Sequence, residues 1–343
     1  MKYLWAYSIP VATLFALYFQ GIASYFTVFF AFVFIPILER ILPEDAKNAT
    51  EEEYKQLAVS KKYDLLLYLN VPIVFALLYY FLYTTSNPNT STFEIIGFTL
   101  CAGILLGANG INVAHELGHR VTLSERIAAK ILLIPTLYMH FFIEHNHGHH
   151  VHVATPEDPS TAKYNQSVFR FWIQTVYGTY KKAWQIQKQL NSQKHISWYS
   201  PQNDMLWFTI LQAAYLTSNY YFFGFLGFSL AIVAAVVGFL LLETINYIEH
   251  YGLRRKILPS GRYERVDRIH SWNSNHILGR IILYELTRHS DHHYKSTKKY
   301  QTLKHHPESP QLPYGYPTSM VLALIPPLWF QVMNKNIPKE MLF

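Results

Sequence analysis

The sequence predicts an all-α integral membrane protein with six transmembrane helices and a histidine-rich di-metal cap on the cytoplasmic side. Half of the 343 residues are hydrophobic, yet the mean hydropathy is only +0.06, so strongly apolar and strongly polar stretches must alternate. All 17 histidines lie at or beyond residue 115. The 29 lysines and arginines are absent from two long apolar regions, 64–114 and 205–246.

Six apolar segments approach the ~20 residues that a helix needs to cross a bilayer. They are residues 4–20, 22–38, 65–84, 93–114, 205–223 and 224–246. The first two follow Lys2 without a small-residue cleavage site, so we expect a retained helical pair and not a signal peptide. Two shorter apolar stretches, 127–143 and 319–333, are interrupted by proline and are predicted to be interfacial or re-entrant.

The basic residues orient these helices. One lies at Lys2, five lie in 39–63, nine in 115–204 and fourteen in 247–343. With six spans and a cytoplasmic N-terminus, these four segments fall on one side, which the positive-inside rule identifies as the cytoplasm. We therefore expect residues 1–343 to form a single membrane-embedded domain. We expect this domain to lie in the inner membrane, with both termini in the cytoplasm.

Counting 127–143 as a span would place 144–162 and 247–343 on opposite faces, against the charge rule. The stretch EDAKNATEEEYKQLAVSKKYD is predicted to be a solvated helical connector.

The first of four histidine motifs is NVAHELGHR, at the cytoplasmic end of the fourth predicted span. His115 and His119 are four residues apart and share one helix face. Taken alone this is the HExxH pattern of zinc proteases, in which Glu116 would be the general base. It is equally typical of a helix end whose imidazoles meet water and the helix dipole.

The second motif is EHNHGHHVHVATPEDPSTA. One helical face can carry His145 and His149 while His150 points to the adjacent face, so one short segment offers two ligand directions. His147 and His152 fall off that face and are expected to be outer partners or solvent-facing. The following TPEDPS is interpreted as a turn that ends the segment and caps the next helix.

The third and fourth motifs are ELTRHSDHHYK and NYIEHYGLRR. The third supplies His289, His292 and His293. Asp291 is expected to orient an imidazole from the outer shell. The fourth supplies His250, with Asn246 one turn earlier and Glu249 beside it as further outer-shell candidates. The histidines without paired spacing are expected at the surface or in an outer shell; they are His270, His276, His305 and His306.

The number of imidazoles indicates the kind of metal site. The four motifs hold nine matched histidines, all at one predicted membrane face. A catalytic zinc site uses about three protein ligands and leaves one position open, so nine would overfill it. Two octahedral-leaning ions fit the number, and imidazole-rich ligation suits iron. The sequence therefore predicts two non-haem iron ions.

At these motifs the sequence resembles the integral-membrane alkane 1-monooxygenases, within the membrane histidine-box enzymes that include fatty acyl desaturases and xylene monooxygenase. The matching segments are HELGHR, EHNHGHHVHVATPEDPSTA, NYIEHYGL and RHSDHH; ATPEDPS together with NYIEHYGL favours alkane hydroxylases over desaturases. The family's metal ligands carry over to His115, His119, His145, His149, His150, His250, His289, His292 and His293.

The resemblance implies that O2 is activated at a di-iron site and that one oxygen atom enters the terminal C–H bond of a medium- to long-chain n-alkane taken from the bilayer. It also implies rubredoxin and rubredoxin reductase as electron donors. The chain has one cysteine, Cys101, so it has no internal disulfide and no centre that needs four cysteine ligands. It has no glycine-rich dinucleotide motif after a predicted strand. A net charge of +7 favours a small acidic donor, and no nucleic-acid partner is expected.

Three alternative functions are to be compared with this one. A fatty acyl desaturase or an alkyl-aromatic hydroxylase would share the histidine motifs. A membrane zinc metalloprotease using HELGH would leave seven of the nine histidines idle. A divalent-metal transporter or sensor would need ligands along its path, but the predicted helix centres contain no histidine or basic residue.

Overall fold

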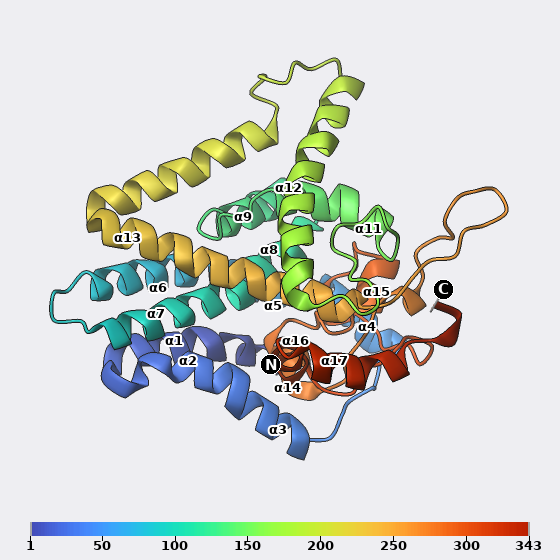
Figure 1. Ribbon diagram of the computed structural model, residues 1–343, viewed down its shortest axis with the longest axis horizontal. Coiled ribbons are helices and arrows are strands. Elements are labelled where there is room, and N and C mark those ends of the chain that lie inside the picture. Colours follow the sequence, from blue (N-terminus) through green and yellow to red (C-terminus); the bar gives the residue numbers. More distant parts are fainter. Residues whose placement is uncertain (1, 342–343) are drawn as a thin grey trace. The chain divides into compact units, whose positions relative to one another are not determined.

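A computed structural model describes residues 2–341, and the regular elements in this range are all helical, as the sequence predicts (Figure 1). The chain forms two compact units. Unit 1 contains the described residues up to Phe34, Lys61–Ile143 and Ala183–Leu242. Unit 2 contains Ile35–Ser60, Glu144–Lys182 and the described residues from Glu243 onward. The single-domain organisation stays a prediction.

Unit 1 is built mainly from long apolar helices. Its elements are α1 (Ser8–Phe19), α2 (Phe26–Phe29), the π-helix η3 (Phe30–Phe34), α5 (Lys61–Tyr68), α6 (Asn70–Thr85), α7 (Thr92–Leu105), the π-helix η4 (Leu106–Ile111), α8 (Asn112–Gly118) and α9 (Leu123–Leu133). Helices α12 (Val168–Gln193) and α13 (Asp204–His250) belong partly to unit 1 and partly to unit 2.

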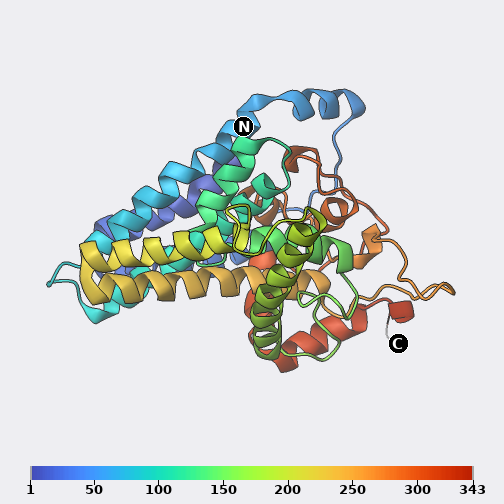
Figure 2. The ribbon, with the colours of Figure 1, turned by 90° about the horizontal axis from the view of Figure 1, so that it is seen from above.

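Four helical stretches are long and apolar enough to cross a membrane. They are Gly21–Ile41, Lys61–Thr85, Thr92–Gly118 and Asp204–His250. Helix α13 leaves helical geometry at Gly224, where φ is 64° and ψ is −166°. The chain reverses direction there, so the two arms of α13 form a helical hairpin whose arms diverge from the turn in Figure 1; Figure 2 shows the same hairpin from above. This turn falls at the predicted boundary between the segments 205–223 and 224–246.

A buried polar contact fixes the π-helix that leads into the HELGH motif. The Asn109 side-chain amide donates to the Ala6 carbonyl at 3.1 Å and to the Asn70 Oδ1 at 2.8 Å. Within an apolar helix such groups need internal partners, because no water is available to satisfy them. A π-turn adds one residue to the helix and rotates everything after it. The contact therefore helps to set the direction in which α8 presents its histidines.

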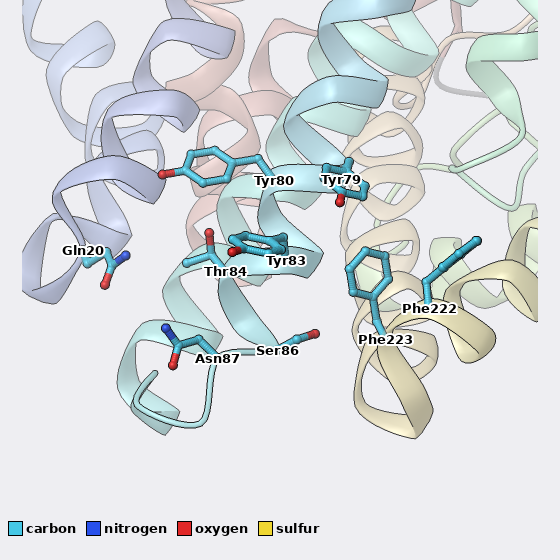
Figure 3. A pocket seen from close by; sticks show the side chains of 9 residues that line it. All are labelled: Gln20, Tyr79, Tyr80, Tyr83, Thr84, Ser86, Asn87, Phe222 and Phe223. Atoms are coloured by element: carbon cyan, nitrogen blue, oxygen red, sulfur yellow. The ribbon is translucent and has the colours of Figure 1, made fainter.

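A pocket lies at the turns of unit 1, at the other end of the Thr92–Gly118 stretch from the HELGH motif. Its volume is about 510 Å³, and it is lined by Gln20, Tyr79, Tyr80, Tyr83, Thr84, Ser86, Asn87, Phe222 and Phe223 (Figure 3). The rings of Tyr79 and Phe223 meet edge to face at 5.7 Å. Tyrosines mixed with polar groups are typical of a membrane–water boundary.

Unit 2 consists of short helices joined by long loops. Its elements are α3 (Ile35–Ile41), α4 (Glu51–Val59), α11 (His150–His152), α14 (Ile277–Ile282), α15 (His289–Tyr294), α16 (Tyr316–Ala323) and α17 (Pro326–Met333), with the π-helix η5 (His145–His149); helix α10 (Phe141–Glu144) ends in this unit. Arg288, just before α15, donates to the carbonyls of Leu303 at 2.6 Å and Lys47 at 2.7 Å. These contacts fix the start of the helix that carries three of the motif histidines.

The prolines and the connector behave largely as predicted. Helix α9 ends at Leu133, before Pro135, and α16 and α17 are separated before Pro326. The connector contains α4, whose capping box joins Thr50 and Glu53 through two hydrogen bonds of 2.8 and 3.2 Å. The membrane position of the two proline-broken stretches stays a prediction.

Candidate metal centre

Four imidazoles of unit 2 converge on one point. They belong to His149, His250, His289 and His293, whose ligand atoms lie within 4.8 Å of one another and whose side chains are all buried. The Nε2 of His289 is 3.2 Å from that of His250 and 2.9 Å from that of His293. We call these residues the four-histidine group.

A second set of imidazoles in unit 2 converges in the same way. The Nε2 of His150 is 3.1 Å from that of His145 and 3.2 Å from that of His292. We call these three residues the three-histidine group. Unit 2 thus brings together seven of the nine predicted ligands, in two groups.

The histidines of the EHNHGHH segment divide between these two groups. The sequence placed His145 and His149 on one helical face, with His150 on the next. In the structure His145 pairs with His150, and His149 belongs to the four-histidine group. The segment is a π-helix from His145 to His149, and the rings of these two residues stack at 5.2 Å. The shared face of His145 and His149 agrees with the prediction, whereas their division between two ligand groups did not follow from the spacing.

His149 is held from its outer side by a carboxylate that the sequence analysis missed. Its Nδ1 lies 2.9 Å from the Asp158 Oδ2, which also accepts from the Thr161 hydroxyl at 2.6 Å. Burial opposes ionisation of Asp158, but the nearby His149 and the hydrogen bonds from His149 and Thr161 lower its pKa. A carboxylate on Nδ1 fixes the ring so that Nε2 faces a metal. The signal was present, because Asp158 lies in the ATPEDPS segment.

The ATPEDPS segment corrects one prediction. TPEDPS was expected to cap the next helix, yet α12 begins only at Val168. The Asp158 side chain instead accepts from the backbone N–H of Ser160 at 3.0 Å and closes a local turn. The ligand segment does end where the turn begins, after His152.

The three predicted outer-shell residues differ in what they touch. The Glu249 Oε2 lies 3.2 Å from the Nε2 of His289. The Asn246 amide donates to a carboxylate oxygen of Glu243 at 3.0 Å. The Asp291 carboxylate accepts from Lys298 at 2.6 Å and lies 2.8 Å from the Nε2 of His306. Of these three residues, Glu249 contacts a predicted ligand imidazole.

His115 and His119 lie in unit 1, where α8 ends. Their rings are 4.9 Å apart, and both side chains are buried. Glu116, the general base of a zinc-protease reading, is ion-paired with Arg120 at 2.7 Å. Arg120 also lies 3.3 Å from Asp64. A carboxylate engaged by a buried guanidinium is a poor proton acceptor, which weighs against the protease reading.

The remaining histidines of the second motif point away from the two groups. His147 is exposed. His152 pairs with Glu157 at 2.8 Å through its Nδ1. Both observations agree with the prediction that these two residues fall off the ligand face.

The donor set suits a metal ion. The Nε2 of His149 is buried and, among the described residues, has no hydrogen-bond partner, although its ring faces three other imidazoles. Burial, followed by the neighbouring histidines, lowers the pKa of His293 well below its usual value. Neutral imidazoles offer lone pairs for coordination, and a shared cation would satisfy nitrogens that otherwise face one another.

Comparison with known proteins places these motifs in a family. Residues 91–321 match the fatty acid desaturase family model. The chain is 40% identical over 308 residues to an alkane 1-monooxygenase of Acinetobacter baylyi, covering 89% of this chain and 74% of that protein. It is 39% identical over 304 residues to alkane 1-monooxygenase 1 of Pseudomonas aeruginosa, covering 88% and 80%.

A more distant match lies among the aromatic oxygenases. The hydroxylase component of the xylene/toluene monooxygenase of Pseudomonas putida is 27% identical over 304 residues, covering 87% of this chain and 78% of that protein. The higher identities confirm the resemblance drawn from HELGHR, ATPEDPS and NYIEHYGL. The chain belongs to the alkane 1-monooxygenase family, within the wider fatty acid desaturase family.

Proposed function

We propose that this chain hydroxylates medium- to long-chain n-alkanes at the terminal carbon, using O2 and giving a primary alcohol. The observation that carries the proposal is the pair of convergent histidine groups in a chain about 40% identical to curated alkane 1-monooxygenases. The balanced reaction converts RH, O2, two electrons and two protons into ROH and water. One oxygen atom forms the new C–O bond, and the other is reduced to water.

The metal centre in this proposal contains two iron ions held by the nine motif histidines. Seven come from the two groups of unit 2, and His115 and His119 are assigned to the same centre from the motif resemblance. When bound, the iron ions would supply the redox chemistry that no amino-acid side chain here offers. The protein's part is to hold neutral imidazoles in place, with Asp158 fixing the ring of His149.

The membrane part of the proposal has six spans, with the N-terminus and the histidine motifs in the cytoplasm. The one-sided distribution of lysine and arginine and the turn of α13 at Gly224 support it. The test places a cysteine in TTSNPNTS, in a background lacking Cys101, and another in place of Lys181. The first should react with an impermeant reagent outside intact cells and the second should not; the opposite pattern would refute this orientation.

Terminal attack makes the proposal testable by product analysis. A terminal C–H bond is stronger than a methylene C–H bond, so an unrestrained oxidant would favour internal carbons. Positioning of the methyl end must overrule that preference. The iron-reconstituted chain, supplied with octane, acyl esters and xylenes, should convert octane mainly to 1-octanol. Mainly secondary alcohols, or a desaturated acyl product without alkane oxidation, would contradict the proposal and favour the other branches of the superfamily.

Electrons are proposed to come from rubredoxin, itself reduced by rubredoxin reductase. Tyr294 is half-exposed and directly follows His293 in the chain. The Arg268 guanidinium lies 4.1 Å from the centre of its ring, and exposed Lys295 is the next residue. An exposed residue one peptide bond from a proposed ligand, beside the cationic side chains of Arg268 and Lys295, suits contact with a small acidic donor.

A further inference from the structure

We propose that Glu249 is itself a ligand of the metal ion in the four-histidine group, not an outer partner of one of its imidazoles. This inference rests on the proposed metal centre. It adds a carboxylate to a ligand set that the motifs describe as histidine alone.

Glu249 faces the His289 ring at its Nε2 edge. A carboxylate that merely orients a metal-binding histidine bonds the nitrogen remote from the metal, as Asp158 does with the Nδ1 of His149 at 2.9 Å. Glu249 instead faces the Nε2 of His289 at 3.2 Å. That same Nε2 faces the Nε2 atoms of His250 and His293. The Glu249 Oε2 therefore lies on the side of His289 where the ligand atoms converge.

The spacing of the atoms agrees with this assignment. The Oε2 of Glu249 is as far from the Nε2 of His289 as the His250 nitrogen is, at 3.2 Å in both cases. Donor atoms bound to one ion at about 2.1 Å lie about 3 Å apart when their bonds are at right angles. An octahedral ion held by four imidazoles would keep two positions for further ligands, and a carboxylate oxygen is a suitable donor for one of them.

The other oxygen of Glu249 is fixed by a single buried contact. The Tyr316 hydroxyl donates to the Oε1 at 2.7 Å. Glu249 is 1% exposed and Tyr316 is fully buried. Holding Oε1 leaves Oε2 to point at the histidines, so Tyr316 is a positioning residue for the carboxylate.

Charge gives a further reason for a carboxylate at this point. The four imidazoles of this group are neutral when they coordinate, so a divalent ion among them would keep its full charge in a buried site. A buried carboxylate is likewise costly unless a cation lies beside it. A direct bond between Glu249 and the ion resolves both costs at once.

The test uses ⁵⁷Fe-loaded full-length protein, Mössbauer spectroscopy and iron quantification. Glu249→Gln should alter the signal of one iron only and weaken its retention against a chelator by at least ~10-fold. Glu243→Gln is the matched control, since Glu243 is an equally buried carboxylate of α13 that bonds Thr175 and Asn246. Two unchanged iron signals in Glu249→Gln would overturn the assignment.

Two further measurements keep the test decisive if Glu249→Gln folds poorly. Glu249→Ala should regain the altered iron signal when acetate is added, because a free carboxylate can occupy the vacated space. In the unaltered protein, the infrared difference between iron-loaded and iron-free forms should contain a carboxylate stretching change that is lost in Glu249→Ala. No acetate effect and no carboxylate change would contradict the proposal. Failure of the unaltered protein to bind iron at all would instead contradict the proposed function.

Discussion

The Nδ1 of His149 lies 2.9 Å from the Oδ2 of Asp158, and both side chains are fully buried. The two residues are nine positions apart, on opposite sides of the turn that ends the ligand segment. The Asp158 carboxylate also accepts hydrogen bonds from the Thr161 hydroxyl and the Ser160 N–H. Asp158 is therefore a preformed acceptor that determines which nitrogen of His149 faces the other imidazoles.

Replacing Asp158 by Asn should weaken metal binding without unfolding the chain. The amide keeps the shape of the side chain but loses the charge that orients the His149 ring, and outer partners of this kind contribute about 10- to 100-fold in metal affinity. Iron retention against a competing chelator measures the effect. Glu157→Gln is the control, because Glu157 is exposed and pairs with His152. Equal retention in both variants would show that Asp158 does not position His149.

Single histidine substitutions should separate the two groups. His150→Ala removes a member of the three-histidine group, and His289→Ala removes a member of the four-histidine group. Each should lower the iron content from about two ions toward one and remove a different Mössbauer signal, with loss of octane hydroxylation in both. His305→Ala should keep iron and activity, since His305 contacts Asn48 through its backbone. Loss of the same iron signal in both ligand variants would refute the division.

Charge reversal near Tyr294 should weaken the interaction with the electron donor. Lys295→Glu should raise the KM for rubredoxin by roughly 3- to 10-fold at low ionic strength and flatten its dependence on salt, while kcat at saturating donor stays the same. Lys181→Glu, an exposed position on α12, serves as the control. A donor KM that responds equally to both substitutions would remove the support for a docking surface at Tyr294.

Acidification should destabilise the protein partly through His140. Burial lowers the pKa of His140 to about 3, and the Tyr138 ring packs against it at 4.2 Å. Because this lies below the usual value of 6.5, the unfolded state binds the proton first. Above pH 6.5, His140 therefore does not lower the free energy of unfolding. Below pH 6.5, its protonation in the unfolded state lowers the free energy of unfolding by up to about 1.4 kcal/mol per pH unit.

His140→Phe removes this ionisation while keeping a ring beside Tyr138. Thermal unfolding of both proteins in detergent at pH 7.5 and 5.5 measures the difference. The original protein should lose more stability than the variant over this interval. Parallel losses would mean that His140 is not held neutral in the folded protein.

Much of the fold was predictable because its signals are local in the sequence. Apolar runs long enough to span a bilayer indicated the long helices, and Gly224 turns α13 at the predicted boundary. Prolines ended the short apolar helices where expected. The nine candidate ligands followed from histidine spacing and the family resemblance, and seven of them converge within unit 2.

The pairing of those ligands could not be read from spacing. The rings of His145 and His149 stack as their spacing allows, yet the Nε2 of His145 lies beside that of His150, and His149 belongs to the four-histidine group. The π-helix η5 has no distinct sequence pattern, because tertiary packing decides where such a turn forms. Asp158 lay in the ATPEDPS segment, but its role was not assigned, because an Asp that forms a turn and an Asp that bonds a histidine look alike in a sequence.

The sequence by itself therefore determined that this is an all-helical chain with long apolar segments and a histidine-rich site, because hydropathy and side-chain chemistry are properties of individual residues. Only the tertiary structure decided that His145 and His149 belong to different ligand groups, that Asp158 bonds His149, and that Glu249 faces the Nε2 of His289. The physical reason is that these contacts depend on the directions in which the side chains point in the folded chain. The number of residues between two side chains does not determine those directions. The side chain of Glu249 meets His289 across 40 residues because Tyr316, still further along the chain, fixes the other end of its carboxylate.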